Sequence, residues 1–316
     1  MIDNYGRKIN YLRVSVTKRC NLNCSYCGAQ NEKTENELSA EQIEKVVKAF
    51  AQCGITKVRL TGGEPLVRKD ICDIAKRISK IDTIKKLALT TNGVLLKDCA
   101  KDLKDAGVNA INISLDTTDR ELFKQLTGRD VLHKVYEGID ECERVGLLPI
   151  RINAVLIKGQ NDSEAESLIK IAKERDIDVR FIELMPFSRE GEDKSLVITG
   201  DEILSRFPFL KPVSANGSDF EKSVARYYEA DSFKGKIGLI TPVSDKFCNE
   251  CNRIRLLSDG KVKPCLGSDL TFDLKEVIND DVMLQETIKQ AIFSKPMEHK
   301  FSCGYGQHHG MNRIGG

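Results

Sequence analysis

The sequence predicts an α/β protein built on a parallel β-sheet, because short apolar runs alternate with helical patterns over its first 185 residues. The runs are rich in Val, Ile and Leu and are bounded by Gly, Asp, Asn or Pro, as strands are. Consecutive β/α units form a parallel sheet with right-handed crossovers, either a doubly wound sheet or a partial (β/α) barrel. Ligands bind at the C-terminal ends of the strands in both. The six predicted strands are residues 11–17, 55–61, 84–90, 108–115, 149–156 and 177–185.

The segments between these strands carry signals of helix starts and ends. A Ser or Thr followed three residues later by Glu or Gln is a capping box, which begins a helix. Glycine just beyond an apolar helical pattern is typical of a helix end. The predicted capping boxes are Ser39 with Gln42, Thr118 with Glu121, and Ser163 with Glu166, and the predicted ends are Gly54, Gly107 and Gly146.

The pattern changes after residue 185, so we predict one unit over 1–185 and a second over 186–316. In the second unit, Asp259-Gly260 is a strong signal for a hairpin turn. The predicted elements are loops at 186–200 and 211–222, a strand pair in 224–241, a hairpin in 253–266, a helix at 271–292 and an irregular glycine-rich tail at 304–316.

Composition excludes several classes of protein. The 316 residues are 41% hydrophobic and 30% charged, which excludes a mainly disordered chain. Forty-nine Lys and Arg oppose 47 Asp and Glu, so no global basic field indicates nucleic acid as a partner. No apolar run approaches the roughly 18 residues of a membrane helix, and the N-terminus resembles no signal peptide. We therefore expect a cytoplasmic protein that binds neither nucleic acid nor membrane, with its eleven cysteines as thiols or metal ligands.

Six cysteines form two trios. Three thiolates are one short of a closed zinc site, whereas three cysteines on a [4Fe–4S] cluster leave one iron open for chemistry. Zinc completed by a distant histidine is the alternative, with His299 as the candidate for the second trio. The first trio is Cys20, Cys24 and Cys27, and the second is Cys248, Cys251 and Cys265. For the dispersed cysteines we expect packing roles: Cys53, Cys72, Cys99, Cys142 and Cys303.

The first trio resembles the cluster motif of the radical S-adenosylmethionine (SAM) superfamily. Its spacing is C-x3-C-x2-C, and the aromatic Tyr26 precedes the last cysteine. Gly62-Gly63-Glu64-Pro65, after the second predicted strand, is similar to the GGEP motif of that superfamily. The resemblance implies a [4Fe–4S] cluster that binds SAM through its open iron and reductively cleaves it to a 5′-deoxyadenosyl radical. The GGEP motif implies a contact to the amino group of SAM.

The second trio narrows the resemblance to one family. Residues 248–266 resemble the C-terminal cluster motif of the GTP 3′,8-cyclase family, which begins molybdenum cofactor biosynthesis. This resemblance implies a partial (β/α)6 radical SAM barrel with a C-terminal segment that carries a second [4Fe–4S] cluster. Further segments like that family are Gly6-Arg7, residues 12–17, Lys295-Pro296-x-x-His299-x-Phe301 and Gly315-Gly316.

Arginines stand inside otherwise apolar predicted strands. Strands of a covered parallel sheet are normally apolar on both faces, and an unpaired buried charge is costly. These arginines therefore need anionic partners, and the planar guanidinium suits phosphate. Exposed strand ends or local carboxylate partners are the alternative. The four within the sheet are Arg13, Arg59, Arg151 and Arg180, while Arg253 and Arg255 lie two residues apart beside the second trio.

The family resemblance assigns site residues at matching positions. It implies GTP contacts at Arg13, Arg59, Thr90, Arg151, Arg253 and Arg255. It implies SAM contacts at Tyr26, Gly63, Ser114, Arg180 and Met185, and cluster ligation by the two trios. Gly315 and Gly316 are expected to thread close to the substrate as catalytic residues. The chain departs from the family at Arg151, where Lys is usual, and at Gly28-Ala29, where Met-Pro is usual.

The resemblance also implies a reaction. The radical removes the ribose 3′ hydrogen of GTP, and the C3′ radical attacks C8 of guanine, giving (8S)-3′,8-cyclo-7,8-dihydroguanosine 5′-triphosphate. The implied partners are an electron donor, a downstream cyclic pyranopterin monophosphate synthase and a second copy in a homodimer. Two rivals remain open: a two-cluster radical SAM enzyme acting on a peptide, and a metal-storage or electron-carrier protein without enzymatic activity.

Overall fold

A twelve-stranded sheet organises the computed structural model, which describes residues 1–27, 36–187, 189–213 and 224–301. Its strand order is β12-β11-β10-β1-β2-β3-β4-β5-β6-β9-β8-β7. The first half supplies β1 (Tyr11–Ser15), β2 (Lys57–Thr61), β3 (Lys86–Thr91), β4 (Ala110–Ser114), β5 (Ile150–Leu156) and β6 (Ile177–Glu183). The second half supplies β7 (Lys211–Pro212), β8 (Arg226–Glu229), β9 (Ile237–Ile240), β10 (Arg253–Leu256), β11 (Lys261–Lys263) and β12 (Phe272–Asp273).

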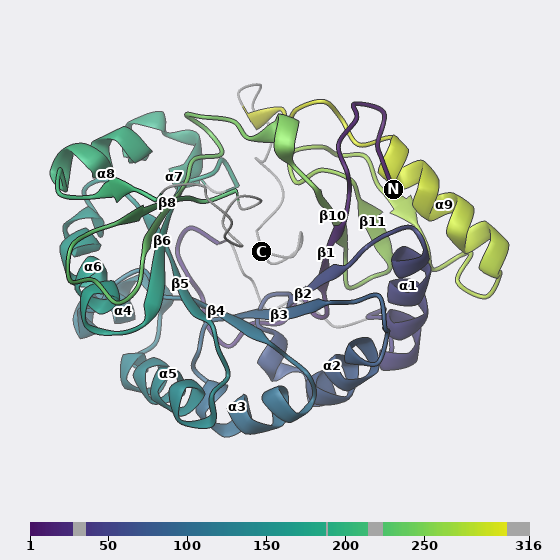
Figure 1. The fold of residues 1–316 in the computed structure, drawn as a ribbon, viewed down its shortest axis with the longest axis horizontal. Coiled ribbons are helices and arrows are strands. Elements are labelled where there is room, and N and C mark those ends of the chain that lie inside the picture. The colour runs from purple at the N-terminus through teal and green to yellow at the C-terminus, as the bar shows by residue number, and fades with distance from the viewer. Residues whose placement is uncertain (28–35, 188, 214–223, 302–316) are drawn as a thin grey trace.

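The six predicted strands are confirmed, and they pair in parallel and in chain order from β1 to β6. A doubly wound sheet would reverse its strand order at a switch point, so chain order favours the barrel arrangement. The sheet ends at β12 and β7 without joining, and Figure 1 shows it curving into an open arc. The fold is therefore a partial barrel, extended in parallel by β10 beside β1 and by β9 beside β6.

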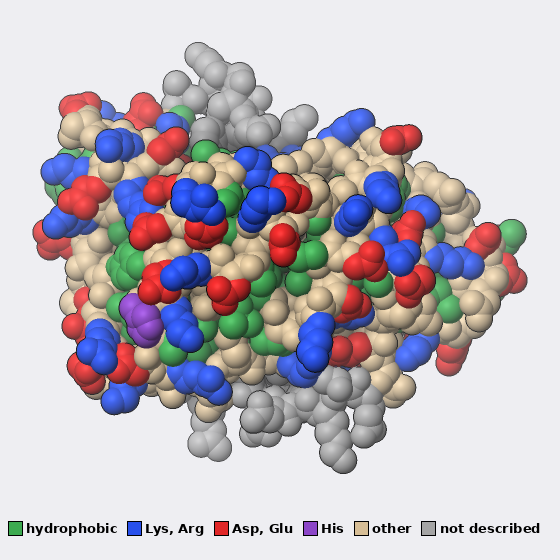
Figure 2. Space-filling view, turned by 90° about the horizontal axis from the view of Figure 1, so that it is seen from below, with side chains coloured by type: hydrophobic (Ala, Val, Ile, Leu, Met, Phe, Trp, Pro, Cys, Tyr) green, Lys and Arg blue, Asp and Glu red, His purple; other side chains and the backbone are tan. Residues whose placement is uncertain are grey.

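Helices cover the outer side of this arc, and their apolar faces bury the outer face of the sheet (Figure 1). Lys, Arg, Asp and Glu are mixed over the exposed surface seen from below, with no large patch of one sign (Figure 2). The helices are α1 (Ala40–Gln52), α2 (Ile71–Ser79), α3 (Leu96–Asp105), α4 (Arg120–Thr127), α5 (Leu132–Val145), α6 (Ala165–Glu174), α7 (Arg189–Glu192), α8 (Gly200–Arg206) and α9 (Asp281–Phe293). In the described parts of the chain, none is long and apolar enough to cross a membrane.

The observed starts and ends of the helices confirm some of the predicted capping residues and contradict others. The box at Ser39 is confirmed at the start of α1. Gly146 directly follows α5 with φ 69°, whereas Gly54 and Gly107 lie two residues beyond the last residues of α1 and α3, each with φ 94°. The box at Thr118 is wrong, because Asp119 caps α4 by accepting from Leu122 N at 2.7 Å. The box at Ser163 is also wrong, because a 3-10 turn occupies residues 162–164 and α6 begins without a side-chain cap.

Three predictions for the second half need correction. The loop expected at 211–222 begins with β7, because residues 211–212 pair with β8, and its residues 214–222 lie outside the described residues. The helix expected at 271–292 begins at residue 281, because Asp280 caps it and residues 272–273 pair as β12. Residues 186–200 include α7 and lead into α8, which a capping box of Thr199 and Glu202 begins. The strand pair β8–β9 and the hairpin β10–β11 are confirmed, with Gly260 at φ 91° in the turn. The sheet continues past residue 185, and the proposed boundary there stays a prediction.

The N-terminus is fastened to the second half of the chain through Arg7. Its guanidinium pairs with Asp3 at 2.6 Å, and both side chains are buried. The same guanidinium donates to the carbonyl oxygens of Cys248 at 2.8 Å, Pro296 at 2.7 Å and Met297 at 2.9 Å. Arg7 therefore holds the loop of the second cysteine trio against the barrel.

We predict that Arg7→Met lowers the free energy of unfolding by about 3 kcal/mol, because it leaves the buried Asp3 carboxylate and several carbonyls without their cation. Urea unfolding measures this change. The double variant Asp3→Asn/Arg7→Met is the control, and it should lose less stability than the single variant. A single variant as stable as the parent would contradict the anchoring role.

Candidate active site

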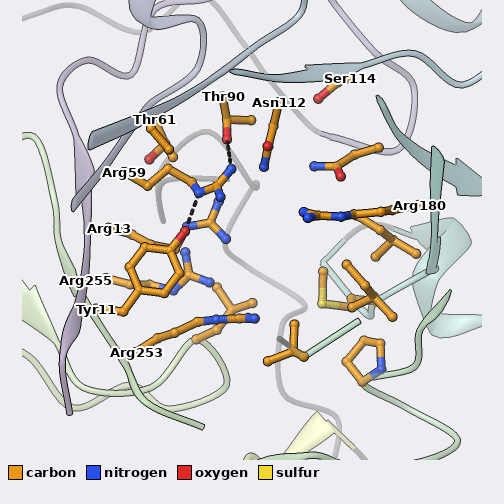
Figure 3. A pocket seen from close by; sticks show the side chains of 18 of the residues that line it. Tyr11, Arg13, Arg59, Thr61, Thr90, Asn112, Ser114, Arg180, Arg253 and Arg255 are labelled. Carbon is orange, nitrogen blue, oxygen red and sulfur yellow. Dashed lines mark hydrogen bonds between the residues drawn. The ribbon is translucent and has the colours of Figure 1, made fainter. Parts of the chain in front are cut away.

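The inner side of the sheet encloses a cavity of about 410 Å³. All six cysteines of the two trios line it, although the trios lie more than 200 residues apart in sequence. Strands β1 to β6 and β10 supply much of the wall. The curved sheet thus brings both trios to the same cavity as the strand arginines. Figure 3 shows Arg13, Arg59, Arg180, Arg253 and Arg255 among the side chains that line this cavity.

Strand register gathers the arginines of β1, β2 and β10 on one wall of the cavity, the arginine wall, which consists of Arg13, Arg59, Arg253 and Arg255. Arg13 of β1 is aligned with Arg255 of β10 on one side and with Arg59 of β2 on the other. On the following strands, one row aligns Thr90, Asn112 and Arg151, and another aligns Ser114, Asn153 and Arg180. All of these side chains line the cavity. The alignment of β10 with β1 was not foreseen from the sequence.

The cavity is strongly cationic. Its described lining contains six arginines, three lysines and Asp116 as the one carboxylate. The Nε of Arg13 is buried with no hydrogen-bond partner in the described structure. Burial and the neighbouring Arg255 hold the pKa of Arg13 well below its usual value. A buried guanidinium without a carboxylate favours an anionic ligand, so the wall is suited to phosphate groups.

Arg151 and Arg180 differ from Arg13 because the side chain of each has a partner for its Nε atom. Arg151 Nε lies 3.3 Å from Asp178 of the neighbouring β6, so the local carboxylate that we considered as an alternative exists here. Arg180 Nε donates to the hydroxyl of Tyr227 at 2.7 Å. Both arginines still line the cavity, and their expected ligand contacts stay predictions.

The first trio lies on the loop after β1, and the glycine pair packs against this loop. A Cβ at Gly63 would lie 2.4 Å from the Arg19 carbonyl oxygen, and a Cβ at Gly62 would lie 2.5 Å from that of Thr17. Gly63 N also donates to Thr17 O at 2.8 Å. Only residues without a side chain allow this approach, so the pair holds the cysteine loop in place.

Glu64 follows the glycine pair and is fully buried. Its carboxylate accepts from Leu66 N at 2.9 Å, Thr91 Oγ1 at 2.8 Å and Asn92 N at 2.6 Å. Burial raises the pKa of Glu64 to about 7, against the lowering effect of these bonds. Asn92 also donates from Nδ2 to Cys20 Sγ at 3.8 Å, so one network joins the GGEP segment to the first trio.

Asp116 is a site residue that our sequence reasoning missed. The hydroxyl of Tyr26 donates to its Oδ2 at 2.5 Å, and Val155 N donates to its Oδ1 at 2.8 Å. Burial raises the pKa of Asp116 to about 6. A signal was present, because Asp116 stands two residues beyond Ser114 at the C-terminal end of a predicted strand.

A buried lysine, Lys295, lies beside Cys251 of the second trio. Lys295 Nζ donates to Arg253 O at 2.8 Å and Pro264 O at 2.9 Å. Burial acts to raise the pKa of Cys251, but Lys295 and Arg253 outweigh it and lower that pKa. His299 contacts Pro242 O through Nε2 at 2.8 Å, and its Nδ1 accepts from Phe301 N at 3.4 Å. Both ring nitrogens are engaged, which argues against zinc completed by His299.

The donor sets of both trios fit iron–sulfur clusters. Each offers three free thiols facing one cavity, and thiolates are the usual ligands of such clusters. Among the described residues, no three Cys, His, Asp or Glu side chains are grouped to hold a single metal ion. In a [4Fe–4S] cluster each cysteine binds a different iron, so the three sulfur atoms need not converge on one point. The assignment of clusters to the two trios therefore rests on the chemistry of the thiolate ligands.

The remaining predicted residues divide into three groups. Thr90, Ser114 and Met185 line the cavity at or near the ends of β3, β4 and β6. Cys53 and Cys142 lie in the hydrophobic core, and Cys72 and Cys99 pack against it, which confirms their packing roles. Gly28, Ala29, Cys303, Gly315 and Gly316 lie outside the described residues.

We predict that the free energy of unfolding falls between about pH 4.5 and pH 7 through Glu64. The unfolded chain loses this proton near pH 4.5, whereas the folded protein keeps it until about pH 7, so rising pH favours unfolding. Urea titrations over this range should show a dependence of up to about 3 kcal/mol that Glu64→Gln removes. Identical slopes for the parent and Glu64→Gln would contradict the assignment.

Comparison with known proteins finds two matching families and full-length relatives. Residues 14–172 match the Radical SAM superfamily, and residues 177–301 match the family Molybdenum Cofactor Synthesis C. The chain is 44% identical to GTP 3′,8-cyclase of Alkaliphilus oremlandii over 324 residues, covering 100% of both chains. It is also 44% identical to GTP 3′,8-cyclase of Clostridium botulinum (strain Langeland) over 307 residues, covering 95% of this chain and 94% of that one.

Solved structures agree on the fold. SuiB of Streptococcus suis superposes with a TM-score of 0.58 at 20% identity, over 83% of this chain and 61% of the SuiB chain. The full-length identity to the curated enzymes and the two matched families together make the assignment: the chain belongs to the GTP 3′,8-cyclase family of the radical SAM superfamily.

Proposed function

We propose that this protein catalyses the radical SAM cyclisation of GTP to the 3′,8-cyclised dihydro-GTP, the first step of molybdenum cofactor biosynthesis. The observation that carries the proposal is a cavity lined by nine cations and one carboxylate, with a cysteine trio at each of two sites. The full-length relatives at 44% identity are themselves GTP 3′,8-cyclases. A triphosphate supplies the negative charge that such a cavity favours.

The arginine wall is the proposed triphosphate site. Arg13 is best placed for it, because its buried Nε has no partner in the described structure. Arg59 and Arg253 form no salt bridge with a described carboxylate, so their charge serves a ligand. Several guanidinium forks hold a phosphate chain in one orientation, which fixes the ribose. The proposed GTP contacts are Arg13, Arg59, Thr90, Arg151, Arg253 and Arg255.

SAM is proposed to lie on the other side of the cavity, beside the first trio. The Gly62–Gly63 loop brings backbone close to that trio, and Glu64 supplies a buried carboxyl group near it. The Tyr26–Asp116 pair stabilises the ring next to Cys27. When bound, the cluster of the first trio and SAM supply the one-electron chemistry that abstracts a substrate hydrogen. The proposed SAM contacts are Tyr26, Gly63, Ser114, Arg180 and Met185.

A second [4Fe–4S] cluster is proposed on Cys248, Cys251 and Cys265. Lys295 and Arg253 place positive charge beside Cys251, which favours the thiolate form needed for ligation. A cluster with three cysteines leaves one iron for the guanine base. The base and the triphosphate would then be held in the same cavity, which fixes the position of the ribose between them.

Several further parts of the proposal rest on the family resemblance. Gly315 and Gly316 are proposed to reach the substrate, where their lack of a Cβ permits a close approach. The product is proposed to pass to a cyclic pyranopterin monophosphate synthase. An electron donor and a homodimeric assembly complete the proposed partners.

The activity is tested with anaerobically reconstituted protein, SAM, dithionite and GTP, against ATP and no-nucleotide controls. We expect 5′-deoxyadenosine to form with GTP, together with an isomer of GTP that converts to a pterin. Mass spectrometry quantifies both products. Deoxyadenosine without dependence on nucleotide, with GTP unchanged, would move the substrate to the peptide class. Cluster-loaded protein that releases no deoxyadenosine would indicate a protein without this enzymatic activity.

We predict that Cys248→Ser halves the iron content, from about eight to about four irons per chain, because it removes a ligand of the second cluster only. Cys72→Ser is the matched control, because Cys72 lies on α2 outside the cavity lining, and it should keep all iron. Iron and sulfide analysis with Mössbauer spectroscopy makes the measurement. Equal iron in the parent and Cys248→Ser would exclude Cys248 as a ligand.

A further inference from the structure

Tyr11 lies at the centre of the arginine wall and is not among the proposed GTP or SAM contacts. It stands on β1 two residues before Arg13, and strand register aligns it with Arg253 of β10 and Lys57 of β2. Its side chain lines the cavity among the guanidinium groups (Figure 3). The described residues of β1, β2 and β10 that face Tyr11 from this wall are therefore cations.

Tyr11 contacts the side chains of two of these cations, Arg59 and Arg253. Its hydroxyl accepts a hydrogen bond from Arg59 Nε. The guanidinium carbons of Arg59 and Arg253 lie 5.8 Å and 6.0 Å from the centroid of its ring, within cation–π range. Arg59 Nη1 also donates to Thr90 Oγ1 at 3.1 Å. The two hydrogen bonds occupy two of the five N–H donors of Arg59 and leave three for a ligand.

A phenol suits this position better than a carboxylate would. Arg13, Arg59 and Arg253 repel one another in a desolvated wall, so something must hold them in a common direction. A carboxylate would neutralise them and compete with an anionic ligand, whereas a neutral hydroxyl accepts a hydrogen bond and keeps their charge. Burial raises the pKa of Tyr11, but Arg59, Arg13 and Arg253 outweigh burial and lower it to about 8, so the hydroxyl is mostly protonated at neutral pH.

We propose that Tyr11 is a positioning residue that aims the Arg59 and Arg253 guanidinium groups at a polyphosphate in the cavity. The identification of this ligand as GTP rests on the proposed function. The hydroxyl orients Arg59, the ring supports Arg59 and Arg253 together, and Tyr11 itself forms no bond to the reacting atoms. Tyr11 thereby lowers the cost of ordering two long side chains when the ligand binds.

The opposite wall offers a matched control. Tyr227 of β8 accepts from Arg180 Nε at 2.7 Å, and its ring centroid lies 5.5 Å from the guanidinium carbon of Arg180. The chemistry of this tyrosine–arginine pair repeats that of Tyr11 and Arg59. Arg180 is proposed to contact SAM, so removal of the Tyr227 hydroxyl should affect SAM and leave polyphosphate binding unchanged.

The test compares reconstituted parent protein, Tyr11→Phe and Tyr227→Phe. Equilibrium dissociation constants are measured for GTP, for inorganic tripolyphosphate and for SAM, and KM and kcat are measured for the reaction. We expect Tyr11→Phe to weaken binding of GTP and tripolyphosphate about tenfold, because a hydrogen bond to a charged group is lost. Its KM for GTP should rise in proportion, with kcat within about twofold of the parent and SAM affinity unchanged. Tyr227→Phe should weaken SAM instead.

Each other outcome has a definite meaning. Unchanged affinity of Tyr11→Phe for tripolyphosphate would overturn the proposal, as would an equal loss of affinity for SAM, which indicates general damage to the cavity. Parent protein that does not bind tripolyphosphate would overturn it too. Parent protein that binds tripolyphosphate but does not convert GTP would overturn the proposed function, and the tripolyphosphate measurements would still decide the role of Tyr11.

Discussion

Concentrated positive charge on the inner face of the sheet is the constraint on which the site depends. Arg255, Arg13 and Arg59 stand in register on three adjacent strands. Burial and neighbouring arginines lower the pKa values of Arg13 and Arg255. A closed, fully packed barrel interior would not tolerate them. The open arc leaves a cavity in front of these arginines, so an anionic ligand bound there offsets the free-energy cost of burying their charge. Site structure and ligand binding are therefore energetically coupled.

The second half of the chain completes this cavity, because it extends the sheet at both ends. Strand β10 brings Arg253 and Arg255 beside β1, while β9 pairs with β6. Buried polar anchors hold these additions: Arg7 binds carbonyls around the second trio, and Glu183 accepts from Val243 N and Ser244 N at 2.9 and 3.0 Å. The two trios consequently face one space from opposite segments.

Local patterns predicted the framework well, because strand and helix periodicity is a property of neighbouring residues. Each predicted strand of the first half lies within two residues of the observed one. Predictions failed where two local signals competed. Asp119 stands next to Thr118 and caps α4 in its place, and the apolar pattern that begins at 271 contains a short strand before α9. Residues 272–273 pair with β11, and this contact between distant parts of the chain cannot be predicted from helical periodicity.

The six β/α units, the two cysteine trios and the arginines in apolar strands could all be predicted from the amino-acid sequence, because each depends on a short stretch of chain. Which residues meet in the cavity became known only from the folded sheet. It placed Arg255 beside Arg13, Asp178 beside Arg151, Asp116 on Tyr26 and Tyr11 on Arg59. The physical reason is that partners across parallel strands depend on strand order and register, which arise from packing of the whole sheet and not from any local pattern.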